Sequence, residues 1–210
     1  MAEPGNNSQT LRALWREVGR DIDAYAEHAA DLAGRRAGRL RRISSFLTPP
    51  LSCAFFYRLS HWLWNRDCHK SAYLLGLINY LLHKADISPA AHIGAGLYIP
   101  HTVGIVFHGH AGDDLALFAH AIVCASGARP ALSNPGPACP QLGNRVTVGA
   151  FSVVTGPVLI GDGVKIGAAA VVIEDIVQGA VGTGAMPMVR RRASAAIAGA
   201  DSGTVGGGLV

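Results

Sequence analysis

Residues 87–123 read ISPAAH IGAGLY IPHTVG IVFHGH AGDDLA LFAHAI V, and an apolar residue opens every block of six. After an interruption, residues 142–177 repeat the pattern as LGNRVT VGAFSV VTGPVL IGDGVK IGAAAV VIEDIV. An α-helix repeats about every 3.6 residues and a strand about every 2, so neither explains this period. A solenoid of short strands does, because each coil stacks its aliphatic residue on the coil before it. The small residues that often follow, as in Ile93-Gly94, suit its corners.

Composition is typical of a protein with a buried core. The chain has 210 residues, enough for one or two domains. Four cysteines show no pairing or metal-binding spacing and are interpreted as free thiols in a reducing compartment, namely Cys53, Cys68, Cys124 and Cys139. The net charge of +4 could indicate nucleic acid, but much of it lies in two runs, 35–42 and 190–192. No nucleic-acid partner is therefore expected.

Hydropathy gives no reason to place the chain in a membrane. The N-terminus lacks the basic-then-apolar layout of a signal peptide. The longest strongly apolar segment, residues 72–82, is too short to cross a bilayer. We therefore expect a cytoplasmic protein that has no membrane partner.

Helical patterns precede the solenoid. Apolar residues at helical spacing from Leu11 to Leu32 predict one amphipathic helix. Residues 34–42, with five arginines, are interpreted as a solvated helix end or linker, with anion binding as the alternative. After Pro49-Pro50, the segments 51–65 and 71–83 predict two helices whose aromatic residues are typical of a core or a subunit interface. These helices are expected to cap the end of the solenoid.

Three segments resemble the bacterial serine O-acetyltransferases, which belong to the hexapeptide-repeat acyltransferase superfamily: YRLSHWLW at 57–64, ADISPAAHIG at 85–94 and HTVGIV at 101–106. The resemblance runs from about Phe55 to about Val189. It implies an α+β fold in which an N-terminal helical domain precedes a left-handed parallel β-helix. The domains expected are a helical domain at 1–84, an acyltransferase domain at 85–189 with an extended loop at 124–141, and a basic exit with a flexible tail at 190–210.

The activity that the resemblance implies is acetyl transfer from the thioester of acetyl-CoA to an acceptor hydroxyl. An alcohol is a poor nucleophile at neutral pH, so a positioned imidazole must take its proton, which typically contributes about 10²–10⁴-fold. Backbone N–H groups must then hold the oxyanion. His101 matches the family's catalytic histidine, and the alternative is a structural histidine on the solenoid surface.

The acceptor side departs from the family. Family active-site residues are replaced here by Pro100, Gly109, Ala138 and Cys139. The missing arginine at Ala138 is the group expected to hold the serine carboxylate. Substitutes could come from nearby polar residues, and we take His110 as the second catalytic histidine; the others considered are His108, Asp113, Asp114 and Arg129. Otherwise the acceptor is a hydroxyl or amine compound other than free serine, for instance in specialised metabolism.

The donor side is closer to the family. Gly127 matches a glycine whose backbone approaches the coenzyme, while Ala150 and Ala168 match small residues beside its pantetheine arm. Arg190 and Arg191 could bind the coenzyme phosphates, or they could belong to a solvated exit from the last coil. Acetyl-CoA is thus the expected co-substrate, and no metal is expected.

Two other functions stay open at the level of sequence. A catalytically inactive homologue with a regulatory role would share the fold without turnover. A hexapeptide-repeat carbonic anhydrase would need three histidines on zinc, and His101, His108 and His110 cluster in sequence. The resemblance also implies a homotrimer or a dimer of trimers, a small-molecule acceptor, and a C-terminal tail that contacts a partner sulfhydrylase.

Overall fold

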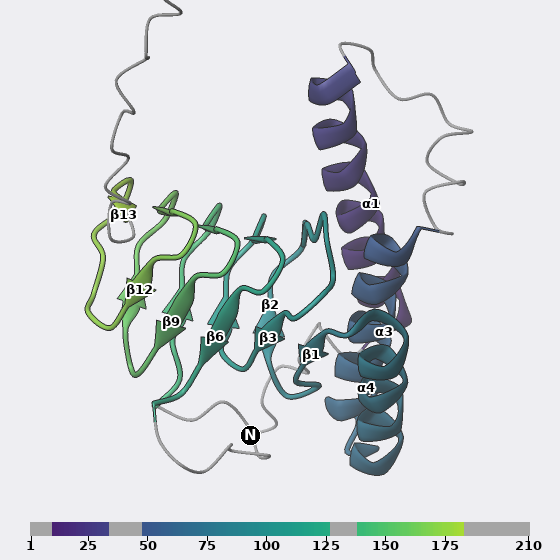
Figure 1. Ribbon diagram of the computed structural model, residues 1–210. Helices are drawn as coiled ribbons and strands as arrows, with labels where there is room; N and C mark the ends of the chain where they lie inside the picture. The colour runs from purple at the N-terminus through teal and green to yellow at the C-terminus, as the bar shows by residue number, and fades with distance from the viewer. Residues whose placement is uncertain (1–9, 34–47, 127–137, 183–210) are drawn as a thin grey trace, which may run out of the picture.

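The computed structural model of the chain describes residues 10–33, 48–126 and 138–182, in which helices come first and short strands follow (Figure 1). The helices are α1 (Leu11–Ala33), α3 (Pro49–Trp64) and α4 (His69–His83). The two prolines lie in the first turn of α3, where a missing N–H costs nothing. Helix α4 ends at Lys84, which adopts a left-handed backbone conformation with φ +57°. The three predicted helices are confirmed.

Three parallel sheets follow, which we call A, B and C. Sheet A contains β1 (Asp86–Ile87), β3 (Val106–Phe107), β6 (Ile122–Cys124), β9 (Val153–Thr155) and β12 (Val171–Val172). Sheet B contains β2 (His92–Ile93), β4 (His110–Ala111), β7 (Gln141–Leu142) and β10 (Leu159–Ile160). Sheet C contains β5 (Ala116–Leu117), β8 (Thr147–Val148), β11 (Lys165–Ile166) and β13 (Val181–Gly182). A parallel bridge from Tyr98 to Ala116 extends sheet C into the first coil.

The chain visits sheets A, B and C in turn, so each circuit is one coil of a β-helix. The second residue of nearly every strand points inward, and the pairing stacks these residues from coil to coil, as in Ile87 on Phe107 and Ile93 on Ala111. The residues that open the six-residue blocks from Ile87 to Val172 are all buried. The fold is therefore the predicted α+β arrangement of helices followed by a left-handed parallel β-helix.

A second apolar position, four residues after the block-opening residue, is less uniform. Leu97, Leu115, Val146 and Val164 are buried as expected for a solenoid core. Val103 is the exception, with 51% of its surface exposed. It lies at a corner that is longer than the others, described below.

Side chains from the helices cover the open edge of the first coil. Arg58 donates to the carbonyl oxygens of Ile93 and Gly94, while Asp21 accepts from the N–H groups of Gly96 and Leu97. Two tyrosine hydroxyl groups also hydrogen-bond this edge. Tyr57 donates to the carbonyl oxygen of Ala91 and accepts from the N–H of Ile93, and Tyr25 donates to the carbonyl oxygen of Ile99 and accepts from its N–H. The predicted capping role of the helices is confirmed, because these groups replace the hydrogen bonds that a preceding coil would make.

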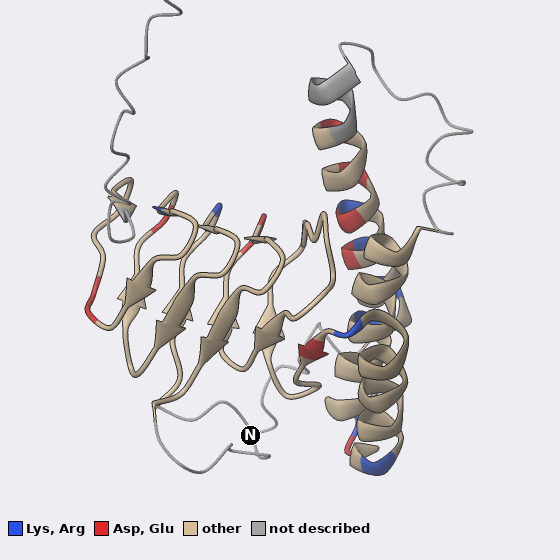
Figure 2. Ribbon diagram, viewed as in Figure 1, with Lys and Arg blue, Asp and Glu red and all other residues tan. Residues whose placement is uncertain are grey.

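Figure 2 shows charged residues along α1 and at the upper edge of the solenoid, whereas the face of sheet A toward the viewer is nearly uncharged. Its outward side chains include Val171, which is 68% exposed, and beyond it Ile173, which is 65% exposed. Helix α4 also exposes a row of leucines and tyrosines. Within the described residues, no helix combines the length and apolar character needed to span a bilayer.

Candidate active site

His101 lies at an enlarged corner of the solenoid. Four residues, 100–103, join Ile99 to Gly104, whereas in the next coil only Phe118 and Ala119 separate Leu117 from His120. The added residues correspond to Pro100 and His101. His101 is exposed, and it makes no hydrogen bond, ion pair or ring contact with the described residues. Its imidazole is therefore available to solvent or to a substrate.

The same corner recurs in every coil, and we call it the His101 corner: residues 100–104, 118–121, 149–152 and 167–170. Each coil closes it with a four-residue turn, as in the hydrogen bond from the Ser152 N–H to the Gly149 carbonyl oxygen at 3.2 Å. Successive turns are joined by backbone hydrogen bonds, including Ala169 N to Ala150 O at 2.8 Å. The predicted coenzyme residues Ala150 and Ala168 thus occupy equivalent positions in adjacent coils, at the corner that carries His101.

Val103 and Ala119 continue this row toward the first coil. Phe151 N donates to Ala119 O at 3.0 Å, and His120 N donates to Val103 O at 2.9 Å. The row Val103, Ala119, Ala150 and Ala168 therefore runs parallel to the solenoid axis. Three of its four members are alanine, so little side-chain volume would obstruct an extended ligand lying along it.

The residues next to this row share an unusual backbone conformation. Gly104, His120, Phe151 and Ala169 all have positive φ, between 57° and 72°. This is the third position of each turn, which ordinarily favours glycine or asparagine. The rings of His120 and Phe151 nevertheless stack there, with centroids 4.5 Å apart and planes 11° from parallel.

His120 was not among the predicted site residues. The sequence does hold a signal, because His120, Phe151 and Ala169 each lie three residues after a block-opening residue of sheet C, namely Leu117, Val148 and Ile166. Only the assignment of blocks to sheets shows that these three positions form one corner.

His110, the predicted second histidine, lies elsewhere on the coil. It belongs to β4 in sheet B, between His92 and Gln141. Its ring is 6.5 Å from that of His92, which in turn is 5.8 Å from that of His61. Burial lowers the pKa of His92, and the neighbouring His110 lowers it further. Within one chain, the structure does not bring His110 to the His101 corner, so its catalytic role stays a prediction.

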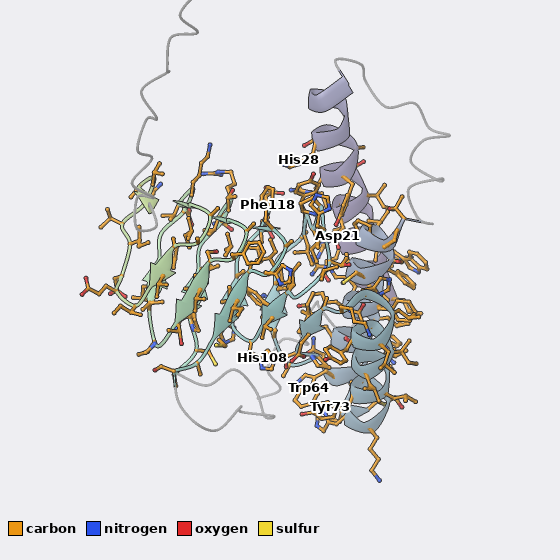
Figure 3. All side chains as sticks on the ribbon, in the orientation of Figure 1. Asp21, His28, Trp64, Tyr73, His108 and Phe118 are labelled. Carbon is orange, nitrogen blue, oxygen red and sulfur yellow. The ribbon has the colours of Figure 1, made fainter. Side chains whose placement is uncertain are left out.

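His108 directly follows β3. It lies at the end of sheet A opposite the corner that contains Phe118, as Figure 3 shows. Its Nε2 atom is buried and makes no hydrogen bond to a described residue, although Asp86 Oδ2 lies 3.4 Å away. His101, His108 and His110 thus lie at three different parts of the coil. Among the described residues, no group of three or more histidine, cysteine or acidic side chains is placed to hold a metal ion.

The other polar candidates have structural partners in the described chain. Asp113 accepts a hydrogen bond from the Ala95 N–H at 2.8 Å, and Asp114 pairs with Arg20 at 3.1 Å.

Gly109 is buried beside Pro140, so a Cβ atom there would lie 2.8 Å from the Pro140 carbonyl oxygen. Cys139 is buried and Ala138 is exposed. Gly127, Arg129, Arg190, Arg191 and the C-terminal tail lie outside the described residues.

A cleft of about 590 Å³ separates α1 from sheet C. Arg20, Glu27 and His28 line it from the helix, and Tyr98 and Arg145 line it from the solenoid. His28 stacks on Tyr98 with ring centroids 3.8 Å apart, and Figure 3 shows His28 on the helix above the first coil. None of the predicted site residues lines this cleft apart from Asp114.

Comparisons with known proteins relate the chain to a family of transferases. A family model described as bacterial transferase hexapeptide (six repeats) matches residues 140–174. A serine acetyltransferase of Helicobacter pylori is 36% identical over 140 residues, covering 66% of this chain and 79% of that protein. A serine acetyltransferase of Mycobacterium tuberculosis is 35% identical over 141 residues, and the chain spans only 59% of its length.

Solved structures show the same fold. The serine acetyltransferase of Neisseria gonorrhoeae superposes with a TM-score of 0.68 at 25% identity, over 82% of this chain and 64% of that one. Soybean serine acetyltransferase complexed with serine superposes with a TM-score of 0.70 at 23% identity, over 83% of this chain and 68% of that one.

Proposed function

This chain belongs to the serine acetyltransferase family, and on that premise we propose that it transfers an acetyl group from acetyl-CoA to the hydroxyl of a small acceptor. His101 is the general base. One observation carries the proposal: His101 shares a corner of the solenoid with Ala150 and Ala168, the small residues predicted to flank the coenzyme. A base and a coenzyme groove must be adjacent for acyl transfer, and residues far apart in sequence meet that requirement here.

The coenzyme would lie along the row of small residues at the His101 corner. Its extended pantetheine arm needs a straight path beside exposed backbone, and the row from Val103 to Ala168 supplies one. Because the row begins beside the enlarged first-coil corner, a thioester at that end of the arm lies nearest His101.

The reaction then needs two proton transfers and the exchange of a carbon–sulfur bond for a carbon–oxygen bond. The neutral imidazole of His101 takes the proton of the acceptor hydroxyl as its oxygen attacks the thioester carbonyl carbon. The carbonyl oxygen becomes an oxyanion, and the carbon–sulfur bond breaks as the carbonyl re-forms. The departing coenzyme A thiolate takes the proton back from the imidazolium, so His101 ends the cycle neutral.

The acceptor is serine or a related hydroxyl compound. A carboxylate acceptor ordinarily needs a bidentate cation, and Ala138 and Cys139 supply none at the positions where the family has such groups. The exposed surface of sheet A supports a homotrimer with active sites between neighbouring solenoids, in which a second chain would complete the acceptor site. A cytoplasmic location follows from the use of acetyl-CoA.

The test is a thiol-release assay with acetyl-CoA against serine, homoserine and amino-sugar acceptors, with mass spectrometry of the products. We expect turnover with at least one hydroxyl acceptor and a product heavier by one acetyl group. Turnover with another acceptor but not with serine would show that the loss of the arginine changed the substrate. No acetylated product from any acceptor would favour a catalytically inactive homologue and overturn the proposal.

A further inference from the structure

We propose that His120 is the second imidazole of the acyl-transfer corner, donating a hydrogen bond to the thioester carbonyl oxygen as it becomes an oxyanion. Phe151 is the positioning residue that holds its ring. The inference rests on the proposed function, and it concerns a histidine that the fold places at the His101 corner.

The first support is location. The His120 backbone N–H bonds the carbonyl oxygen of Val103 at 2.9 Å, one coil below the turn that carries His101. The His120 ring then packs directly on Gly104, because a Cβ atom at Gly104 would overlap its Nδ1 atom. Only a glycine at this point leaves room for the ring. The imidazole therefore lies against the same short segment, residues 101–106, that holds the candidate base.

The second support is the combination of a fixed ring and free nitrogen atoms. Stacking at 4.5 Å on Phe151 restricts rotation of the His120 ring. The ring is half-buried, and neither nitrogen atom hydrogen-bonds a residue within the described ranges. A neutral imidazole carries one N–H donor, whichever nitrogen holds the proton. A donor whose ring is already held in place requires little reorganisation during the reaction.

The third support is the backbone strain at Phe151. A bulky residue with φ near +60° is a conformational outlier, and backbone strain of this kind clusters at functional sites. Burial does not explain the aromatic ring, because 64% of Phe151 is exposed. Two other coils fill the equivalent position with the small residues Gly104 and Ala169. Phe151 covers one face of the His120 ring, and this contact explains an aromatic residue at the position.

The chemistry is compatible with the role of His101. The carbonyl oxygen of the thioester gains negative charge when the acceptor oxygen attacks, and it loses that charge when the carbon–sulfur bond breaks. His120 donates a hydrogen bond throughout and transfers no proton. The proton balance thus stays with the acceptor hydroxyl, His101 and the thiolate.

The test compares His120→Phe, which keeps an aromatic ring for stacking, with His120→Gln, which keeps an N–H donor. The assay is thiol release from acetyl-CoA with the acceptor that the wild type uses best. Removal of one oxyanion donor typically costs about 10²–10³ in kcat, so His120→Phe should lower kcat about 100-fold with little change in KM for acetyl-CoA. His120→Gln should recover part of the loss. The pH dependence of kcat in His120→Gln should have the same shape as in the wild type, because His120 does not exchange a proton.

Phe151→Gly tests the positioning role. It suits the positive φ and should leave the melting temperature nearly unchanged while lowering kcat about tenfold, a fraction of a full donor loss. His69→Phe, an exchange on α4 far from the corner, is the matched control and should keep wild-type kcat.

Three outcomes separate the inference from the proposed function. If the wild type turns over but His120→Phe keeps kcat within threefold, the inference is overturned and the proposed function stands. If His120→Phe and His120→Gln lose activity equally while both melt well below the wild type, His120 is only structural and the inference again fails. No turnover by the wild type overturns both.

Discussion

At the scale of single residues, the pairing of Asp21 with Arg58 links the helices to the solenoid. Arg58 donates from Nε and Nη2 to the two carboxylate oxygens of Asp21 at 2.8 and 2.9 Å, and both side chains are buried. Burial acts to lower the pKa of Arg58, but the Asp21 carboxylate outweighs it and raises the pKa above its ordinary value. Figure 3 shows Asp21 on the side of α1 that faces the first coil.

We predict that Asp21→Ala destabilises the protein by about 3–5 kcal/mol, because it removes the buried carboxylate that pairs with the Arg58 guanidinium. Glu17, whose Oε2 atom lies 3.5 Å from Arg58 Nη1, then remains as its acidic partner. Urea unfolding followed by circular dichroism measures the change. The control is Arg20→Ala, which removes the exposed pair with Asp114 and should cost about 1 kcal/mol or less. Equal, small losses in both variants would show that the Asp21 pair does not hold the cap in place.

His61 makes the stability of the helical cap depend on pH. Its Nδ1 atom bonds the Pro89 carbonyl oxygen at 2.9 Å and its Nε2 atom lies 3.0 Å from Asn65 Nδ2, an arrangement suited to a neutral ring. Burial lowers the pKa of His61 from 6.5 to about 4. The unfolded chain therefore binds the proton more readily than the folded one, and stability falls as the pH drops from about 6.5 toward 4.

Between about pH 7.5 and pH 4.5, this single group should remove roughly 2–3 kcal/mol from the free energy of unfolding. Urea titrations at the two pH values measure the loss in the wild type and in His61→Gln. The variant should lose less by about that amount, although burial also lowers the pKa of His83 and His92 and leaves some dependence. The same pH dependence in both proteins would exclude His61 as its source.

Some residue roles could be read from the sequence and others could not. The sequence singled out His101, Ala150 and Ala168 because they stand in segments that resemble a known family, and the structure places the three at one corner. Asp21 was not singled out, although an acidic residue amid the apolar stripe of Val18, Ile22 and Tyr25 was the available signal. Its partner lies 37 positions away, and no local pattern specifies such a contact.

At the scale of elements, the six-residue period predicted the coils but concealed two changes of length. Inward strand residues lie eight positions apart from Ile99 to Phe107 and four apart from Phe107 to Ala111, where the others are mostly six apart. An insertion at one corner is thus compensated by a deletion at the next. Because the two cancel, the period continues undisturbed through Ile105, and the enlarged His101 corner is invisible in the sequence pattern.

Close stacking of the coils makes some corner glycines essential for a reason unrelated to φ. A Cβ atom at Gly149 would lie 2.7 Å from the backbone nitrogen of Ala168, whereas one at Gly163 would meet nothing within 4 Å. Gly149→Ala should therefore push adjacent coils apart and cost roughly 2–3 kcal/mol. Gly163→Ala should cost only about 1–2 kcal/mol, for its positive φ. Thermal melting of the two variants measures the difference, and a larger loss at Gly163 would contradict this account of the stacking.

At the scale of the whole molecule, the outer face of sheet A is the surface suited to contact between solenoids. Val171 and the neighbouring Ile173 are exposed there, the outward Val106, Ile122 and Val153 are half-buried, and Figure 2 shows this face nearly free of charged residues. Contiguous apolar surface of this kind marks interaction sites.

We therefore predict a trimer in solution that Val171→Asp disrupts. Analytical ultracentrifugation measures the mass, with Leu159→Asp on sheet B as the control for an equally exposed apolar residue, since Leu159 is 53% exposed. The control should stay trimeric. A monomeric wild type would place the acceptor site within one chain, whereas a trimer that tolerates Val171→Asp would show that a face other than sheet A forms the interface.

The central claim is that the imidazole at the enlarged corner acts as the base in acetyl transfer. The most direct measurement is kcat for thiol release from acetyl-CoA by His101→Ala, with the best wild-type acceptor at saturation. A positioned base contributes about 10²–10⁴-fold, so we predict at least a 100-fold loss in a variant that melts like the wild type. A correctly folded His101→Ala protein with kcat within threefold of the wild type would contradict the account.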